Sequence, residues 1–91
     1  MEYILDLSDI YSADELHDLL EEVLPLPEYY GRNLDALHDA LSDLPALQLT
    51  VRNIEVPEAV MGRYMRSFRA VLSDLAEEIP GFSVTYPEEA P

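Results

Sequence analysis

The sequence predicts an α/β fold, with a small three-stranded parallel sheet packed by three or four helices. Two observations lead to this prediction. First, short apolar or alternating segments and segments of helical periodicity follow one another in the order strand, helix, helix, strand, helix, strand. Second, helical segments separate each strand from the next, and such crossovers join parallel strands. The length of 91 residues suits one domain spanning residues 1–91, with residues 87–91 as a loose tail.

Residues 2–7 (EYILDL) form the first predicted strand, because they are nearly continuous in apolar character. A helix is predicted at residues 13–24, where Ser12 and Glu15 have the spacing of an N-terminal capping box. Its buried stripe consists of Leu16, Leu19, Leu20, Val23 and Leu24. His17 has acidic neighbours on this helix, so we expect it at the surface. The prolines that follow end the helix.

Residues 25–44 (PLPEYYGRNLDALHDALSDL) combine a stiff loop with a short helix that begins at Leu34 and ends near Asp43. Asn33 is a favourable N-cap for this helix. One helical face is a leucine stripe, made of Leu34, Leu37, Leu41 and Leu44. The nearly opposite face is an aspartate ridge, made of Asp35, Asp39 and Asp43. Aligned carboxylates repel one another, so the ridge costs helix stability and suggests a function, although a solvated acidic face is an equal explanation.

The remaining segments complete the predicted sheet and add its last helix. LQLTVR at residues 47–52 alternates between apolar and polar residues and predicts the second strand. A long helix is expected at residues 58–78, where Pro57 suits the first turn and Gly62 marks either close packing or a short break. FSVTY at residues 82–86 predicts the third strand.

Charge is the most unusual feature of the composition. Nineteen acidic residues face five arginines and no lysine, which gives a formal net charge of −14. Nucleic acids and anionic membranes attract basic surfaces, so neither is an expected partner. A basic protein is a better candidate, because opposite charges accelerate its approach. The alternative is that the negative charge only keeps the protein in solution.

The sequence also bears on where the protein works. It contains no cysteine, and its start lacks the basic and apolar regions of a signal peptide. Its uncharged runs, such as residues 44–51, are far shorter than the roughly 20 residues that span a membrane. We therefore expect a cytoplasmic protein in a reducing compartment.

No arrangement of residues typical of an enzyme is present. The two histidines lie on different predicted helices, the three glycines are scattered, and no serine lies in a nucleophile elbow. The aspartate ridge offers oxygen ligands to a divalent cation, but from one side only, so no metal or other cofactor is expected. We expect a binding protein and not an enzyme.

The run LPEYYGRNLDALHDAL resembles the barstar family, whose members inhibit barnase-type ribonucleases inside the cell. The matching residues are Leu26, Pro27, Glu28, Tyr29, Tyr30, Gly31, Asn33, Leu34, Asp35, Ala36, Leu37, Asp39 and Leu41. The resemblance implies a small parallel three-stranded sheet packed by helices, in agreement with the element order above. It also implies a mechanism in which loop and helix plug a basic active site, with a carboxylate in the place of a substrate phosphate.

The same resemblance implies which residues touch the partner. Partner-binding roles are carried over to Tyr29, Gly31, Asn33, Leu34, Asp35 and Asp39. Asp39 is the central contact, and Asp43 becomes a bystander. Tyr30 is expected to pack inward. Gly31 either adopts a positive φ or lets the partner approach its backbone closely.

Two positions depart from the family pattern, since His38 and Leu44 stand where barstar carries tryptophan. Leu44 completes the leucine stripe and is expected in the core. His38 lies beside the aspartate ridge, so it can pair with Asp35 or Asp39 or tune the choice of partner, and it joins the partner-binding residues. The family also has an acidic partner contact late in its last helix. Three residues are candidates for this contact here: Asp74, Glu77 and Glu78.

The expected function is therefore that of an intracellular inhibitor. It binds a basic barnase-like ribonuclease, or a related toxin domain, one to one and acts as an antitoxin or immunity protein. The alternative is a barstar-like acidic interaction module that recruits another basic partner.

Overall fold

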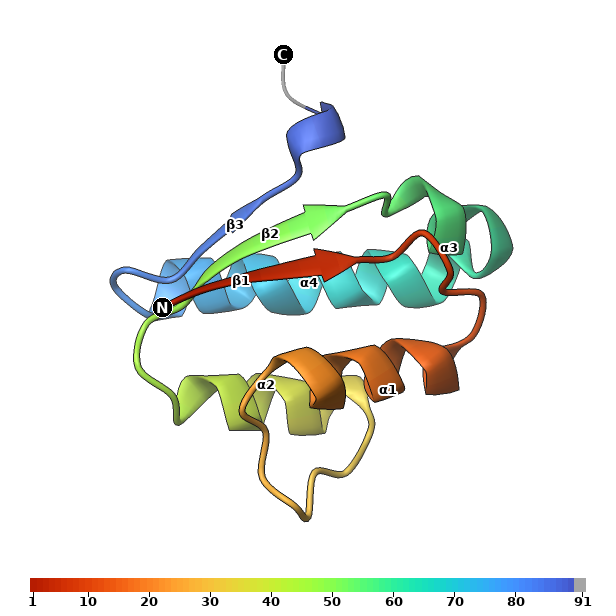
Figure 1. The fold of residues 1–91 in the computed structure, drawn as a ribbon. Helices are drawn as coiled ribbons and strands as arrows, with labels where there is room; N and C mark the ends of the chain where they lie inside the picture. Colours follow the sequence, from red (N-terminus) through yellow and green to blue (C-terminus); the bar gives the residue numbers. More distant parts are fainter. Residues whose placement is uncertain (90–91) are drawn as a thin grey trace.

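The computed structural model describes residues 1–89, which form a three-stranded parallel sheet and four α-helices (Figure 1). Along the chain the elements are β1 (Glu2–Asp6), α1 (Ala13–Val23), α2 (Leu34–Ser42), β2 (Gln48–Arg52), α3 (Glu55–Val60), α4 (Gly62–Glu78), β3 (Ser83–Thr85) and a 3-10 turn, η1 (Pro87–Glu89). The strand order is β1-β2-β3, and both neighbouring pairs are parallel. The predicted α/β fold is confirmed.

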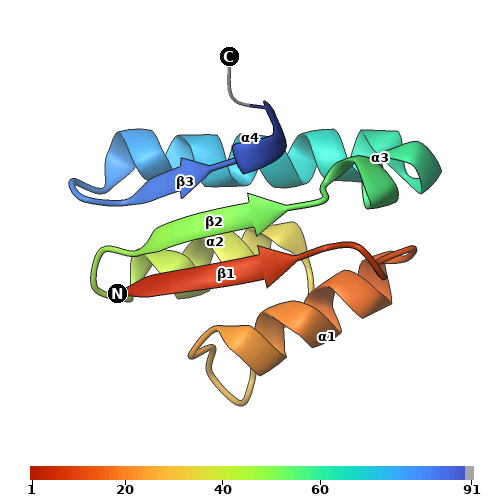
Figure 2. The same cartoon turned by 45° about the horizontal axis from the view of Figure 1, so that its top comes forward.

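The helices α1, α2 and α4 lie on one face of the sheet, so the fold has two layers (Figures 1 and 2). Side chains alternate along the strands accordingly. Leu5, Leu49 and Val51 are buried under the helices, while Ile4 points away from them and is 61% exposed. Parallel sheets are usually covered on both faces. Here the uncovered face is largely polar, since it carries Glu2, Asp6, Gln48, Thr50, Ser83 and Thr85.

The hydrophobic core lies between the sheet and the helical layer. The strand register places Leu5 opposite Val51, and Leu49 opposite Val84. Phe68 of α4 is fully buried in this core. The leucine stripe of α2 packs as predicted: Leu37 and Leu41 are buried, and Leu34 and Leu44 are partly buried against the core.

Side-chain caps fix the first turns of α1 and α2. The Ser12 hydroxyl accepts a hydrogen bond from the Glu15 backbone N–H (3.1 Å). The Glu15 carboxylate reaches the backbone N–H of Tyr11 (2.8 Å), one residue before the cap, so the predicted capping box is present in a shifted form. At α2, the side-chain oxygen of Asn33 accepts a hydrogen bond from the Ala36 N–H (2.7 Å), which confirms the predicted N-cap.

The long helix predicted at residues 58–78 is wrong in one respect, because the chain forms two helices there. A first helix, α3, begins earlier than predicted, at Glu55, and ends at Val60. Met61 then leaves the helical conformation with φ −138° and ψ 59°, and α4 begins at Gly62. Glycine is among the weakest helix formers, so a break next to Gly62 costs little.

The predicted loose tail is also corrected for residues 87–89, which form the turn η1. Glu89 pairs with Arg69 of α4, and the Glu88 carboxylate accepts a hydrogen bond from the Asn53 N–H (2.8 Å). The Arg69 guanidinium also binds Glu58 (2.6 Å) and lies 4.4 Å from the centre of the Tyr86 ring. These contacts hold the turn against the sheet. Residues 90 and 91 lie outside the described part of the chain.

Candidate functional site

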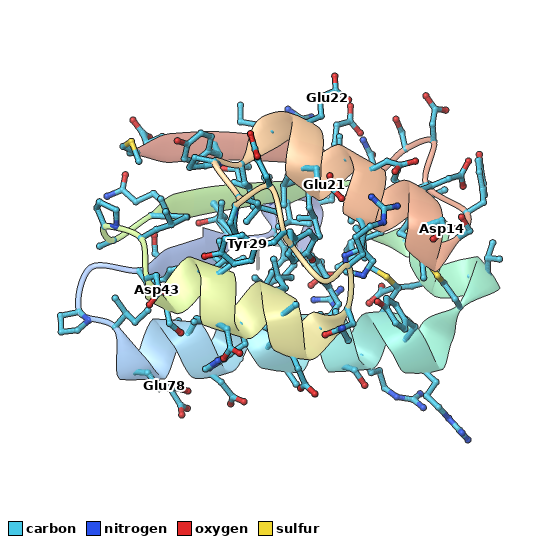
Figure 3. The ribbon with its side chains drawn as sticks, turned by 90° about the horizontal axis from the view of Figure 1, so that it is seen from below. Asp14, Glu21, Glu22, Tyr29, Asp43 and Glu78 are labelled. Carbon is cyan, nitrogen blue, oxygen red and sulfur yellow. The ribbon has the colours of Figure 1, made fainter. Side chains whose placement is uncertain are left out.

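The loop between α1 and α2 presents one tyrosine and buries its neighbour. Tyr29 is 89% exposed, whereas Tyr30 is only 8% exposed. Figure 3, which looks onto the helical layer, shows Tyr29 between α1 and α2. The prediction that Tyr30 packs inward is therefore confirmed, and Tyr29 is left as a large aromatic surface that water covers in the free protein.

His17 anchors this loop, and its predicted place at the surface is wrong. It is 2% exposed, with its ring Nδ1 2.7 Å from the Tyr30 hydroxyl and its Nε2 2.6 Å from the Tyr64 hydroxyl. Both ring nitrogens thus have a hydrogen-bond partner, which lowers the free-energy cost of burying them. Burial lowers the pKa of His17 below its usual range. One feature of the sequence did indicate that His17 is buried. It lies three residues before Leu20, so both side chains lie on the same face of the helix.

Arg32 is a second anchor that the sequence did not reveal. Its guanidinium donates hydrogen bonds to the Asp18 carboxylate (2.8 Å), to the Asp14 carbonyl oxygen (3.1 Å) and to Glu21. The hydrogen bond with Asp18 is the largest cause of its raised pKa. These contacts tie the loop to the acidic face of α1. Arg32 is also the only arginine or lysine in the first 51 residues, which was a signal of its role.

Gly31 allows the loop backbone to lie on the first turn of α2. A Cβ atom at Gly31 would stand 3.2 Å from the Ala36 Cβ and 3.4 Å from the Asn33 side-chain nitrogen. The positive φ offered as one explanation for this glycine is instead found at the next residue, Arg32, with φ 56°. Gly31 is exposed, so its backbone remains open to a partner, as the other explanation requires.

A shallow cleft of about 180 Å³ lies between the loop and α2. It is lined by Pro27, Tyr29, Tyr30, Gly31, Ala36, Asp39, Ala40 and Asp43. Three predicted partner-binding residues, Tyr29, Gly31 and Asp39, therefore meet at one place. The Asp39 side chain is 86% exposed and free to accept hydrogen bonds. Asp43, which the sequence left as a bystander, lines the same cleft because it stands one helical turn beyond Asp39.

The other predicted residues lie outside the cleft lining. Asp35 is exposed in the first turn of α2, and Leu34 is partly buried. Asn33 uses its side-chain oxygen for the cap, and its nitrogen donates to the Gly31 carbonyl (3.3 Å). Asn33 therefore shapes the loop in the free protein, and its partner contact stays a prediction.

His38 connects α2 to the end of α4. Its Nε2 lies 3.1 and 3.2 Å from the two carboxylate oxygens of Glu78, and its Nδ1 lies 3.8 Å from an Asp39 oxygen. The main partner of His38 is therefore Glu78. The sequence had suggested Asp35 or Asp39 instead. Of the three late acids Asp74, Glu77 and Glu78, Glu78 is the one joined to α2. The hydrogen bond with Glu78 raises the pKa of His38.

The pKa of His38, followed by NMR titration of its ring proton, is expected above the usual 6.5. Glu78→Gln should return it toward that value, whereas Glu77→Gln, which changes a neighbouring exposed acid, should leave it unchanged. A raised folded pKa stabilises the protein below about pH 6.5, and this contribution disappears as pH rises through the folded pKa. A pKa at or below 6.5 in the unaltered protein would contradict the His38–Glu78 pairing.

The fold and the cleft define a class of protein: a strongly acidic α/β protein that anchors an exposed loop beside a short acidic helix. Over residues 1–87 the chain matches the family model described as "Barstar (barnase inhibitor)". It is also 40% identical over 79 residues to a Bacillus subtilis (strain 168) protein named "Putative ribonuclease inhibitor YrdF". That match covers 84% of this chain and 86% of the relative.

The chain therefore belongs to the barstar family of ribonuclease inhibitors and is not an enzyme. The resemblance seen in residues 26–41 is confirmed and extends to nearly the whole chain. In the part of the chain that the structure describes, no helix is long and apolar enough to cross a membrane. Within the same residues 1–89, no three His, Cys, Asp or Glu side chains gather as a metal site would require.

Proposed function

We propose that this protein is a cytoplasmic inhibitor of a basic barnase-type ribonuclease or related toxin domain. It binds one to one and covers the enzyme's active site with α2 and the preceding loop. The observation that carries the proposal is the cleft in which Tyr29 of the loop and Asp39 of α2 stand together, exposed, while Tyr30 and Arg32 anchor the loop. The antitoxin or immunity role follows if the target is made by the same cell.

Asp39 is assigned the central role in this proposal. An exposed carboxylate at the edge of a cleft can receive two parallel N–H donors from an arginine, in the way that a substrate phosphate does. Asp43 adds a second negative charge to the same cleft. Asp35 lies one turn before Asp39 on the aspartate ridge. We assign Asp35, Asn33 and Leu34 to the margin of the contact with the ribonuclease.

The loop supports binding because it is held before the partner arrives. Tyr30 is fixed through His17, and Arg32 is fixed through the acids of α1. A preorganised loop loses little conformational entropy on association, so more of the interaction energy appears as affinity. Tyr29 contributes a large and stiff contact area on that loop.

The charge distribution favours a basic target. Figure 3 shows Asp14, Glu21, Glu22, Asp43 and Glu78 spread around Tyr29 on the helical face. Such a field speeds the encounter with a cationic protein and weakens with added salt, because surface charges are screened beyond about 10 Å at 0.1 M. The association rate should therefore fall as salt rises, while the dissociation rate changes less.

The test is a titration of several barnase-type ribonucleases with this protein at low salt. Activity should fall linearly and vanish at one equivalent for at least one enzyme, and stopped-flow association should slow with added salt. The proposal fails if micromolar protein inhibits none of these enzymes. Size-exclusion chromatography of the mixture separately reports the stoichiometry.

A second candidate function is an acidic interaction module for a different basic protein. The observation behind it is His38, which occupies a barstar tryptophan position and is engaged by Glu78, so the α2 face lacks that aromatic surface. Affinity capture from the producing cell distinguishes the two functions. The interaction module is favoured if the captured partner is not a nuclease and is still captured after Asp35 and Asp39 are neutralised.

A further inference from the structure

The longest acid-free segment of this acidic chain lies in its second half. Residues 59–73 include three arginines and neither aspartate nor glutamate, although the whole chain has nineteen acids. They span the end of α3 and most of α4. The charge of this segment is therefore opposite to that of the aspartate ridge.

Two of the three arginines remain available to a ligand. Arg69 is engaged by Glu58 and Glu89. Arg63 and Arg66 are exposed, and neither pairs with an acid anywhere in residues 1–89. In a protein of net charge −14, two unpaired guanidinium groups on one helix face are the natural contact for carboxylates.

A groove lies beside these arginines, at the break between α3 and α4, and we call it the α3–α4 groove. It is lined by Leu34, Val60, Met61, Gly62, Arg63, Tyr64 and Ser67 and encloses about 570 Å³. Val60 is 59% exposed, although it is an aliphatic residue. A Cβ atom built on Gly62 would meet nothing within 4 Å, so the floor of the groove is open. The groove shares no lining residue with the Tyr29–Asp39 cleft.

We propose that the α3–α4 groove binds an acidic peptide segment of a protein other than the ribonuclease. An aliphatic side chain of that segment packs on Val60 and Met61, and flanking carboxylates pair with Arg63 and Arg66. Charge complementarity selects this occupant, because a basic ribonuclease is repelled by the same arginines. The proposal does not depend on the inhibitory function and adds a second, oppositely charged surface to the protein.

The test is a ¹H–¹⁵N NMR titration of the full chain with the synthetic peptide Ac-EELEE-NH₂. Shifts are expected at Leu34 and residues 60–67. The matched peptide Ac-EESEE-NH₂ should bind more weakly, because it lacks the aliphatic side chain. Ac-KKLKK-NH₂ should instead perturb the aspartate ridge. Absence of local shifts up to millimolar peptide, or equal shifts with the serine peptide, overturns the proposal.

Two variants separate binding from folding. Gly62→Leu places a side chain in open space and removes a poor helix former, so the melting temperature should stay equal or rise while peptide binding is lost. The double variant Arg63→Gln, Arg66→Gln should weaken the peptide roughly tenfold or more at low salt. Full binding by a folded Gly62→Leu protein would show that the peptide sits elsewhere.

Discussion

Replacing Asp39 by alanine is expected to weaken binding to a barnase-type ribonuclease by roughly 30- to 4,000-fold. The range corresponds to about 2–5 kcal/mol, the usual cost of truncating one partner of a charge pair that complex formation buries. Among residues 1–89 of the free protein, the Asp39 side chain has no hydrogen-bond partner within 3.5 Å, and the His38 ring nitrogen lies 3.8 Å from its carboxylate. The change should therefore act on the complex and hardly affect the free energy of unfolding.

Inhibition constants for three variants make this prediction specific. Asp43→Ala should cost less than Asp39→Ala, because Asp43 is the C-cap at the end of α2, whereas Asp39 lies in the middle of the helix. Asp9→Ala removes the same charge from an exposed turn outside the cleft, so it should leave the dissociation rate unchanged. If Asp39→Ala stays within twofold of the unaltered protein while inhibition persists, the central role of Asp39 is wrong.

Replacing His17 by alanine is expected to destabilise the protein by about 3 kcal/mol. The change opens a cavity beside α1 and leaves the hydroxyls of Tyr30 and Tyr64 without their imidazole partner. For a small domain this is a large fraction of the total free energy of unfolding, which is about 5–15 kcal/mol. Urea denaturation measures the loss of unfolding free energy. If the loop is loosened as well, the variant should inhibit the ribonuclease more slowly.

His17→Phe fills the site with a somewhat larger ring and removes the hydrogen bonds, so it tests their contribution without opening a cavity. The single changes Tyr30→Phe and Tyr64→Phe each delete one hydroxyl, and combining each with His17→Phe completes a double-mutant cycle. If His17→Ala unfolds at the same urea concentration as the unaltered protein, the buried hydrogen-bond chain does not contribute to stability.

The two histidines are expected to affect stability with opposite signs as pH changes. Burial lowers the folded pKa of His17, so its contribution is complete above the unfolded value of about 6.5 and is lost as pH falls through the folded pKa. The pairing of His38 with Glu78 acts in the other direction. Between about pH 5 and pH 7.5, where carboxylates stay mostly ionised, the unaltered protein should therefore lose stability on acidification more steeply than His17→Phe.

Local patterns were enough to predict most of the fold. The caps at Ser12 and Asn33, the leucine stripe and the alternating strands depend on residues a few positions apart, so a single sequence contains them. The break at Met61 was harder, because a glycine near a helix start is compatible with either continuity or interruption.

The candidate site was predicted less completely. Tyr29 and Asp39 could be proposed as partner-binding residues because both lie in the short run of residues 26–41 that resembles the barstar family. The burial of His17 depends on Tyr64, which is 47 residues away, and the pairing of His38 depends on Glu78, which is 40 residues away. These contacts join side chains of α4 to side chains of α1 and α2, so the identity of each partner cannot be found from residues a few positions apart.

The Tyr30–His17–Tyr64 chain of hydrogen bonds makes the order of the loop depend on α4, which follows the loop in the sequence. Tyr64 belongs to α4, and β3 follows α4, so both must leave the ribosome before the last crossover can close. A nascent chain that has exposed only its first half carries Tyr29 and Asp39 but has no Tyr64 to hold His17 in place. We therefore expect the loop to reach its final order only after α4 has been made and packed, and fragments that end before Tyr64 to hold the loop less firmly than the full chain does.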